Sequence, residues 1–260
     1  MADAIAADLR PDFYIAAIGR SGSTMLCNWL SEPPKRIVFN EPFFLRPANS
    51  RLLRIQLRNL GLEVSEQEWT AADRTPPDRF RRIMGPRLEG RRWAAKEVLC
   101  DEHLAMTRTF APPRVLVTVR DLEQIALSFF EKHRLQDNLD RFSDDWVRDY
   151  CLRESAGILS YLDVLAELRI PSRIVRYEDF IASEAERAAV ADFVGWPGGG
   201  DVAANLEDFD RGFEVRRHGR SFGTQALLRA TLPAVAIAAA REIAECSPAY
   251  QKQFGYRPSN

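Results

Sequence analysis

The stretch FYIAAIGRSGST, residues 13–24, carries the strongest fold signal in this chain. An apolar run over 13–18 stops at Gly19, and a helical pattern of apolar residues begins after Thr24. A buried strand, a tight loop and the start of a helix together present backbone N–H groups and the positive helix end to an anion. The loop also carries three hydroxyls and the guanidinium of Arg20. The segment therefore predicts a site for a tetrahedral anion with several oxygens.

The composition indicates one soluble domain over residues 1–260. Apolar residues make up 46% of the chain, which is ample for a core, and charged residues make up 28%. The formal net charge of −1 provides no global field that would attract nucleic acid or a membrane surface. We therefore expect no nucleic-acid partner, while the oligomeric state is not predicted.

Neither end of the chain indicates export or membrane insertion. The first residues, MADAIAADLRPD, lack a basic and then apolar signal pattern. The longest apolar stretch, 232–240, is too short to span a bilayer and contains Pro233. We expect a cytoplasmic protein without a membrane span.

The cysteines are widely spaced, and they form no CxxC pair. This spacing predicts reduced structural thiols, with neither disulfides nor a metal site. The four positions are Cys27, Cys100, Cys151 and Cys246.

Apolar runs alternate with helical patterns along the rest of the chain. The expected strands are 13–18, 37–39, 93–98, 114–119 and 173–176. The expected helices are 23–31, 50–60, 122–134, 144–169, 184–194 and 225–246, the last bent or started at Pro233. This alternation predicts a three-layer α/β fold with a central, mostly parallel sheet of about five strands flanked by helices.

The residues that follow the strands are the candidates for chemistry, because ligands of such sheets bind beyond the carboxyl ends of the strands. These residues are Arg20–Thr24, Asn40-Glu41, Arg120-Asp121 and Tyr177-Glu178. Residues 61–92 differ from the rest, with Pro and Gly among many Arg and Glu. They are either a mobile insertion that faces the substrate or a solvated pair of surface helices.

The anion loop departs from the Walker A pattern GxxxxGK[ST]. Ala17 stands at the position of the first Gly, and Ser23 stands at the position of the Lys. Arg20, earlier in the loop, supplies the positive charge instead. The loop is therefore not a standard ATP or GTP loop.

RSGST, residues 20–24, resembles the 5′-phosphosulfate loop of sulfotransferases that use 3′-phosphoadenosine 5′-phosphosulfate (PAPS), especially the carbohydrate sulfotransferases. The resemblance implies a P-loop-like sulfotransferase fold in which five loop residues bind the donor: Arg20, Ser21, Gly22, Ser23 and Thr24. In the segment VTVRDLEQIALSFF, Arg120 and a Ser eight residues later, Ser128, match the family pair that holds the 3′-phosphate. The alternative for Arg120 is an ion pair with Asp121 or Glu123.

Two later segments extend the resemblance. RYEDF, residues 176–180, resembles the family segment whose tyrosine reaches the adenine, which implies Tyr177 in that role; alternatively, Tyr177 is a tyrosine at the edge of the core. Within RRHGR, Arg217, His218 and Gly219 resemble a late RKG element that closes over the 3′-phosphate; alternatively, this is a basic surface turn. His replaces the family Lys here, so this contact would depend on pH.

The resemblance also assigns the reacting groups. In WAAKEV, Lys96 matches a family lysine that would hold sulfonate oxygens, but Val98 replaces the histidine base of the cytosolic sulfotransferases. His103 comes five residues later, on the following helix, and neither it nor His133 is assigned to the acceptor pocket. Arg20 would stabilise charge on the leaving phosphate without donating a proton.

The Glu-Pro pair Glu41-Pro42 resembles the pair that supplies the base in the carbohydrate branch, which makes Glu41 the expected general base. Phe43 and Phe44 are expected to form an apolar wall that raises the pKa of Glu41. Alternatively, Glu41 caps the next helix or pairs with Arg46.

The resemblance implies transfer of a sulfuryl group from PAPS to a hydroxyl of a sugar or another small-molecule alcohol, with adenosine 3′,5′-bisphosphate as product. Residues 45–92, a helical and loop insertion, and residues 133–150 are expected to shape the acceptor pocket. Two alternatives remain open: a P-loop small-molecule kinase, with Asp121 ending a strand like that of Walker B, and a non-catalytic nucleotide-binding protein.

Overall fold

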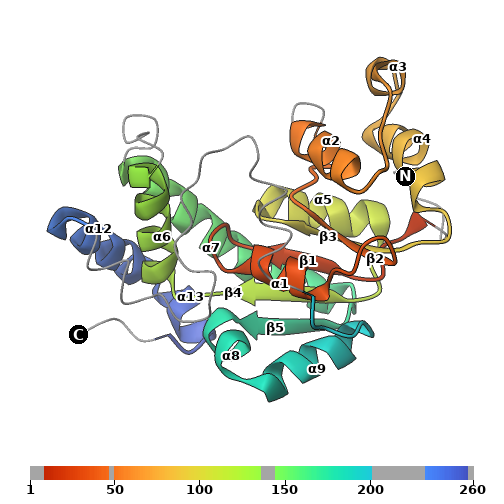
Figure 1. The fold of residues 1–260 in the computed structure, drawn as a ribbon. Helices are drawn as coiled ribbons and strands as arrows, with labels where there is room; N and C mark the ends of the chain where they lie inside the picture. The colour runs from red at the N-terminus through yellow and green to blue at the C-terminus, as the bar shows by residue number, and fades with distance from the viewer. Residues whose placement is uncertain (1–8, 47–49, 136–143, 201–231, 257–260) are drawn as a thin grey trace.

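A computed structural model describes residues 9–46, 50–135, 144–200 and 232–256. Its centre is a five-stranded sheet in the order β2-β3-β1-β4-β5, in which every neighbouring pair is parallel (Figure 1). The strands are β1 (Tyr14–Ala17), β2 (Arg36–Asn40), β3 (Arg92–Glu97), β4 (Val115–Val119) and β5 (Ser172–Arg176). All five predicted strands are confirmed, with ends that agree to within one residue.

Helices flank the sheet and extend beyond it. They are α1 (Ser23–Leu30), α2 (Ser50–Asn59), α3 (Glu66–Thr70), α4 (Pro76–Leu88), α5 (Cys100–Phe110), α6 (Leu122–Leu135), α7 (Asp144–Glu167), α8 (Tyr177–Ala182), α9 (Glu184–Val194), α12 (Ala234–Glu245) and α13 (Pro248–Gln253). In Figure 1, α3 and α4 lie on the opposite side of the molecule from α6 and α12. None of the helices within the described ranges is long and apolar enough to cross a membrane.

Alternate residues of β1 point to opposite faces of the sheet, as the pleat requires. Ile15 packs in the smaller apolar cluster, which contains side chains of α1, α8 and α9. Tyr14 and Ala16 pack in the larger cluster, which contains side chains of α4, α5 and α7. Two helical layers therefore enclose one parallel sheet, and the predicted three-layer α/β architecture is confirmed.

Two short helices escaped prediction. α8 begins at Tyr177, directly after β5, so its first residues look like a loop that follows a strand. α13 has only six residues and begins at Pro248. α12 begins after Pro233, as the sequence predicts, while 225–231 lie outside the described residues.

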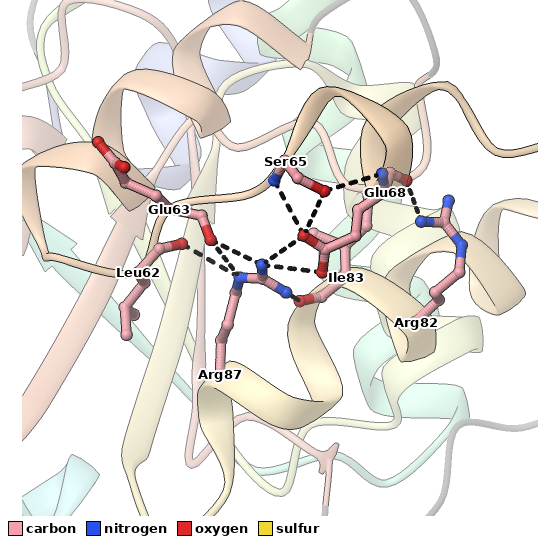
Figure 2. Close-up of polar contacts among 7 residues, drawn as sticks. All are labelled: Leu62, Glu63, Ser65, Glu68, Arg82, Ile83 and Arg87. Atoms are coloured by element: carbon pink, nitrogen blue, oxygen red, sulfur yellow. Dashed lines mark hydrogen bonds and ion pairs between the residues drawn. The ribbon is translucent and has the colours of Figure 1, made fainter.

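The segment 61–92 contains the helix pair α3 and α4, which corresponds to the second interpretation of its sequence. α4 buries Phe80, Ile83, Met84 and Leu88 against the larger cluster, which ties the pair to the core. Its Arg87 crosses to the α3 side and donates hydrogen bonds to the carbonyl oxygens of Glu63 (2.6 Å) and Leu62 (3.1 Å) (Figure 2).

A capping box at the start of α3 completes this contact. Ser65 and Glu68 bond each other's backbone N–H groups, and Arg87 donates to both carboxylate oxygens of Glu68 at 2.9 and 3.1 Å (Figure 2). The hydrogen bonds from Ser65 and from Arg87 lower the pKa of Glu68 to about 2. The guanidinium of Arg87 thus bonds both the backbone before α3 and the capping carboxylate, and Arg82 of α4 also donates to the carbonyl oxygen of Glu68.

Candidate active site

A cleft opens beyond the carboxyl ends of the strands, at the edge of the sheet where the sequence places its candidates. It encloses about 320 Å³. Every strand contributes a residue near its end or just beyond it, and α6 and α7 complete the wall. The lining residues are Gly19, Arg20, Gly22, Ser23, Thr24, Met25, Glu41, Val98, Arg120, Ser128, Phe129, Lys132, Trp146, Tyr150 and Tyr177.

The loop after β1 has the backbone geometry of an anion cradle. Arg20 and Gly22 both have positive φ, 69° and 83°, and α1 begins immediately afterwards at Ser23. No side chain caps this helix, so its first N–H groups face the cleft without a side-chain partner. A Cβ on Gly22 would lie 2.1 Å from Cδ2 of Tyr177, so only glycine fits between the loop and this ring.

Arg20 and Arg120 are in direct contact at the cleft. Arg20 Nε donates to Ser128 Oγ at 3.0 Å, and Arg120 Nη1 donates to the carbonyl oxygen of Arg20 at 3.1 Å. The guanidinium of Arg120 lies 4.4 Å from the centre of the Tyr177 ring. Arg20, Arg120, Ser128 and Tyr177, which the sequence assigns to a single ligand, therefore line one continuous cleft.

Glu41 lies on the cleft wall and forms an ion pair with Lys96, whose Nζ is 2.6 Å from Glu41 Oε1. The lysine side chain is 0% exposed, whereas the glutamate side chain is 30% exposed. Burial raises the pKa of Glu41, but the charges of Lys96, Lys132 and Arg20 outweigh it and lower the pKa below 4.5. The carboxylate is therefore ionised at neutral pH.

The lowered pKa of Glu41 contradicts the expectation that Phe43 and Phe44 raise it. Phe44 packs in the core against Phe39 and Phe80, with ring centres 5.6 and 4.8 Å away. The charges of the nearby cations determine the direction of the Glu41 pKa shift instead.

The turn that carries Glu41 is held by the end of β3. Glu41 and Phe43 have positive φ, 52° and 47°, a strained conformation for residues with side chains. The N–H of Glu41 donates to the carbonyl oxygen of Lys96 at 2.8 Å, and the N–H of Phe43 donates to Oε1 of buried Glu97 at 2.7 Å. Arg46, the alternative partner expected for Glu41, pairs with Glu102 and Asp101 instead.

Several predicted site residues lie away from the cleft wall. Ser21 is buried, and its hydroxyl has no hydrogen-bond partner among the described residues. Lys96 lies behind Glu41. His103 is buried between Tyr14 Oη (2.8 Å) and the carbonyl oxygen of Ala17 (3.1 Å).

His133 is buried, and its ring lies 5.9 Å from that of Trp146, behind the cleft wall. Arg217, His218 and Gly219 lie outside the described residues.

Seven lining residues were not assigned to the site from the sequence: Gly19, Met25, Val98, Phe129, Lys132, Trp146 and Tyr150. Tyr150 is the structural link among them, since its hydroxyl accepts a hydrogen bond from the N–H of Gly19 and donates one to the carbonyl oxygen of Val98, both at 2.9 Å. Trp146 and Tyr150 belong to 133–150, the segment expected to shape the acceptor pocket, and the packing of α7 decides which of its described residues face the cleft. None of the lining residues in the described ranges belongs to 45–92.

The groups in the cleft fit an anionic nucleotide. Arg120 is 7% exposed, and its Nε–H has no hydrogen-bond partner among the described residues. A buried cation with an unused donor is costly unless an anion completes it. Within the described ranges, no three His, Cys, Asp or Glu side chains lie close enough together to hold a metal ion.

Comparisons with known proteins agree with this geometry. No protein-family model matches the sequence, and no curated protein matches it. Among solved structures, the sulfotransferase domain from the curacin biosynthetic pathway aligns with a TM-score of 0.55 and 15% identity, over 96% of this chain and 99% of that one. A sulfotransferase from Mycobacterium avium aligns with a TM-score of 0.51 and 13% identity, over 95% and 77% of the two chains.

A third match, a sulfotransferase from Alicyclobacillus acidocaldarius, is 16% identical over 95% of this chain and 97% of that one, with a TM-score of 0.47. The TM-scores above 0.5 of the curacin-pathway and Mycobacterium avium structures show a shared fold. The five-stranded parallel sheet flanked by helices is thus that of a chain with the sulfotransferase fold.

Proposed function

We propose that this protein transfers a sulfuryl group from PAPS to a hydroxyl of a small-molecule acceptor. The observation that carries the proposal is the single cleft shared by Arg20, Arg120 and Ser128. A nucleotide with phosphates at both its 5′ and 3′ positions needs two adjacent cationic sites, and these residues supply them.

The residues divide between the two ends of the donor. The loop of Arg20, Gly22, Ser23 and Thr24 would hold the 5′-phosphosulfate at the open start of α1. Arg120 and Ser128 would hold the 3′-phosphate, and the Tyr177 ring would face the adenine. Arg217, His218 and Gly219 remain candidates to close over the 3′-phosphate. Ser21 would support the loop from behind, since it is buried and its backbone N–H donates to the carbonyl oxygen of Ile18 at 3.1 Å.

When bound, PAPS supplies an activated sulfuryl group and a phosphate leaving group. Glu41 would take the acceptor proton, and its loss should reduce turnover by roughly 10²–10⁴-fold. Arg20 would stabilise charge on the leaving phosphate, an effect of about 2.7–4 kcal/mol in comparable sites. Lys96 acts through Glu41, which it holds ionised and oriented, so we assign it a positioning role instead of direct sulfonate contact.

Two alternatives predict different behaviour. A kinase would use Asp121 for Mg²⁺, but Asp121 Oδ1 here accepts hydrogen bonds from the N–H groups of Glu123 (2.8 Å) and Gln124 (3.3 Å) at the start of α6. A non-catalytic nucleotide-binding protein would bind the donor without turnover.

The placement of residues 45–92 beside a bound acceptor is also part of the proposal.

The test is formation of adenosine 3′,5′-bisphosphate from labelled PAPS with a panel of acceptors, run with and without EDTA. We expect product in both conditions, and we expect Glu41→Gln to lose turnover while it keeps donor affinity. Binding of PAPS without product for any acceptor would favour the non-catalytic alternative. Loss of activity in EDTA together with ATP turnover would favour the kinase.

A further inference from the structure

The strained turn that carries Glu41 depends on contacts with the end of β3. Glu41 and Phe43 both have positive φ, 52° and 47°, which residues with side chains keep only where their surroundings impose it. The N–H of Glu41 donates to the carbonyl oxygen of Lys96 at 2.8 Å. The N–H of Phe43 donates to the side-chain oxygen Oε1 of Glu97 at 2.7 Å. The second bond uses a side chain, so a single substitution can remove it.

Lys96 and Glu97 reach this turn from opposite faces of the sheet. They are neighbours in β3, and side chains alternate along a strand. Ala95 packs in the larger apolar cluster, so Glu97 points to that side of the sheet and Lys96 points to the other. Lys96 contacts the carboxylate of Glu41, whereas Glu97 holds the backbone two residues further on. The charged end of Glu41 and the backbone of its turn are therefore fixed by two different side chains.

The surroundings of Glu97 keep its carboxyl group uncharged. Glu97 is 0% exposed, and its Oε2 has no hydrogen-bond partner among the described residues. Burial raises the pKa of Glu97 well above 4.5, and the charges of Glu41 and Glu102 add to this effect. The N–H of Phe43 and the charge of Lys96 act the other way without reversing the shift. The ionisable side chains that interact electrostatically with Glu97 come from β1, α1, the turn, β3 and α5, and they are Tyr14, Cys27, Glu41, Lys96 and Glu102.

An uncharged acid suits this position better than a carboxylate. A buried carboxylate with one oxygen left without a partner is far more costly than the neutral acid. A second negative charge would also repel the Glu41 carboxylate. The neutral acid still accepts the hydrogen bond from Phe43, so it can hold the turn without changing the charge of Glu41.

We propose, on the basis of the sulfuryl transfer inferred above, that Glu97 is a positioning residue for the base. Its side-chain oxygen holds the N–H of Phe43, and this contact keeps the carboxylate of Glu41 beside Lys96 on the cleft wall. Glu97 itself is not among the residues that line the cleft. It acts on the reaction only through the turn.

The experiment compares Glu97→Gln with Glu97→Met in the full chain. Glutamine keeps an uncharged oxygen acceptor at about the same reach, whereas methionine has a similar length but no strong acceptor. The first measurement is the pKa of Glu41, from carbon-13 NMR of side-chain carboxyl groups in protein labelled at glutamate, with Glu41→Gln to assign the signal. We expect an unchanged Glu41 pKa in Glu97→Gln. We expect a raised one in Glu97→Met, because the released turn carries the carboxylate away from Lys96.

The second measurement is turnover. Glu97→Met should lower kcat by about 10²-fold, the size expected when a reacting group is displaced by about 1 Å. Its affinity for adenosine 3′,5′-bisphosphate should not change, because the proposed nucleotide contacts lie on the loop after β1 and on the segment from Arg120 to Ser128. Glu97→Gln should keep most of the native kcat.

Glu154→Met is the matched control. Glu154 is 1% exposed, and its Oε2 accepts a hydrogen bond from the N–H of Cys100 at 2.6 Å, so it is also a buried glutamate that holds a backbone N–H. It contacts neither the turn of Glu41 nor the cleft in the described residues. This variant should lower Tm and leave the Glu41 pKa as it is in the native protein.

The outcomes separate a positioning role from a structural one. An unchanged Glu41 pKa in Glu97→Met would mean that Glu97 only fills space, and the proposal would be wrong. A Glu41 pKa that falls in both Glu97 variants would mean that native Glu97 is ionised, which would also overturn it. If Glu97→Met does not fold, the proposal fails on either of two results: a native Glu97 signal of an ionised carboxylate at pH 7, or a changed Glu41 pKa in Glu97→Gln.

The same measurements keep this proposal apart from the proposed function. The NMR titration needs neither donor nor acceptor. The expected Glu41 pKa values, together with no adenosine 3′,5′-bisphosphate formed from PAPS with any acceptor, would leave Glu97 holding Glu41 and would reject the sulfuryl transfer. Product formation by the native protein, with equal kcat in Glu97→Met, would support the transfer and reject the positioning role.

Discussion

The ion pair between Lys96 and Glu41 sets the charge of the carboxylate in the cleft. Burial alone would raise the pKa of Glu41, so the ionised form depends on the cations around it. Lys96 is the closest described cation, at 2.6 Å, and it is wholly buried behind the carboxylate. One buried lysine therefore decides at which pH the proposed base loses its charge.

Replacing Lys96 with Met should move the acid limb of the pH profile. In the native protein the Glu41 pKa is lowered, so the carboxylate stays ionised down to a pH below 4.5, and kcat/KM should fall only as the pH drops through that lower value. Lys96→Met removes the main cation and leaves burial unopposed, so the limb should shift to higher pH. The measurement is kcat/KM against pH, with Lys35→Met on the exposed surface as the control. An unshifted limb in Lys96→Met would mean that this pair does not control Glu41.

Gly22 is the other position where one residue type decides the site. Its φ is 83°, and a Cβ added there would lie only 2.1 Å from the Tyr177 ring, which leaves no room for a side chain. Gly22→Ala should therefore displace Tyr177 and the loop, and weaken binding of adenosine 3′,5′-bisphosphate by about tenfold or more, or about 1.4 kcal/mol. Gly61→Ala is the matched control, because Gly61 also has positive φ (67°) but no atom lies within 4 Å of its added Cβ. Equal nucleotide affinity in Gly22→Ala and the native protein would contradict this role for the loop.

Among the helices, the arrangement of α3 against α4 depends on side chains that connect the two helices at the surface. Arg87 is 13% exposed on its side chain, and it bonds the carbonyl oxygens of Leu62 and Glu63 as well as the carboxylate of Glu68 (Figure 2). The aromatic and aliphatic residues of α4 then bury this pair against the core. The segment is thus a structural unit of the fold.

Arg87→Met should destabilise the protein, because it leaves the Leu62 and Glu63 carbonyl oxygens without this charged donor. The expected loss is about 1–2 kcal/mol, and in a chain of this size each kcal/mol lowers Tm by about 2–4 °C. Thermal unfolding followed by circular dichroism measures the effect, and Arg108→Met on the exposed surface of α5 should change Tm very little. A Tm equal to that of the native protein would show that the contacts of Arg87 in Figure 2 contribute nothing to stability.

The clearest strands were predictable because they are short apolar runs. RVLVTV followed by Arg120 is the clearest case, since β4 is buried at every position. The helices α8 and α13 were not predictable in the same way, because each has six residues, too few for a helical period to stand out. The sequence of 61–92 allowed two interpretations, and the structure shows α3 and α4, which begin at the caps Ser65 and Thr75. The side chains of these caps accept hydrogen bonds from the N–H groups of Glu68 and Asp78.

Across the whole molecule, the cleft exists because parallel strands end at the same edge. This rule allowed Arg20, Glu41, Arg120 and Tyr177 to be placed together from the sequence. The rule says nothing about α7, whose orientation depends on tertiary packing, so Trp146 and Tyr150 emerged only from the structure. The direction of the Glu41 pKa shift was also beyond the sequence, because it depends on how near Lys96, Lys132 and Arg20 come to one carboxylate.

The proposed function requires that one cleft hold both phosphates of a single adenosine nucleotide, with Arg120 at the 3′-phosphate. Calorimetry can compare the affinities of adenosine 3′,5′-bisphosphate and adenosine 5′-monophosphate for the native protein and for Arg120→Met. We predict that the native protein prefers the bisphosphate by at least about tenfold, and that Arg120→Met loses this preference while it binds the monophosphate as before. Equal affinity of the native protein for the two nucleotides, or a preference that survives in Arg120→Met, would contradict the shared cleft.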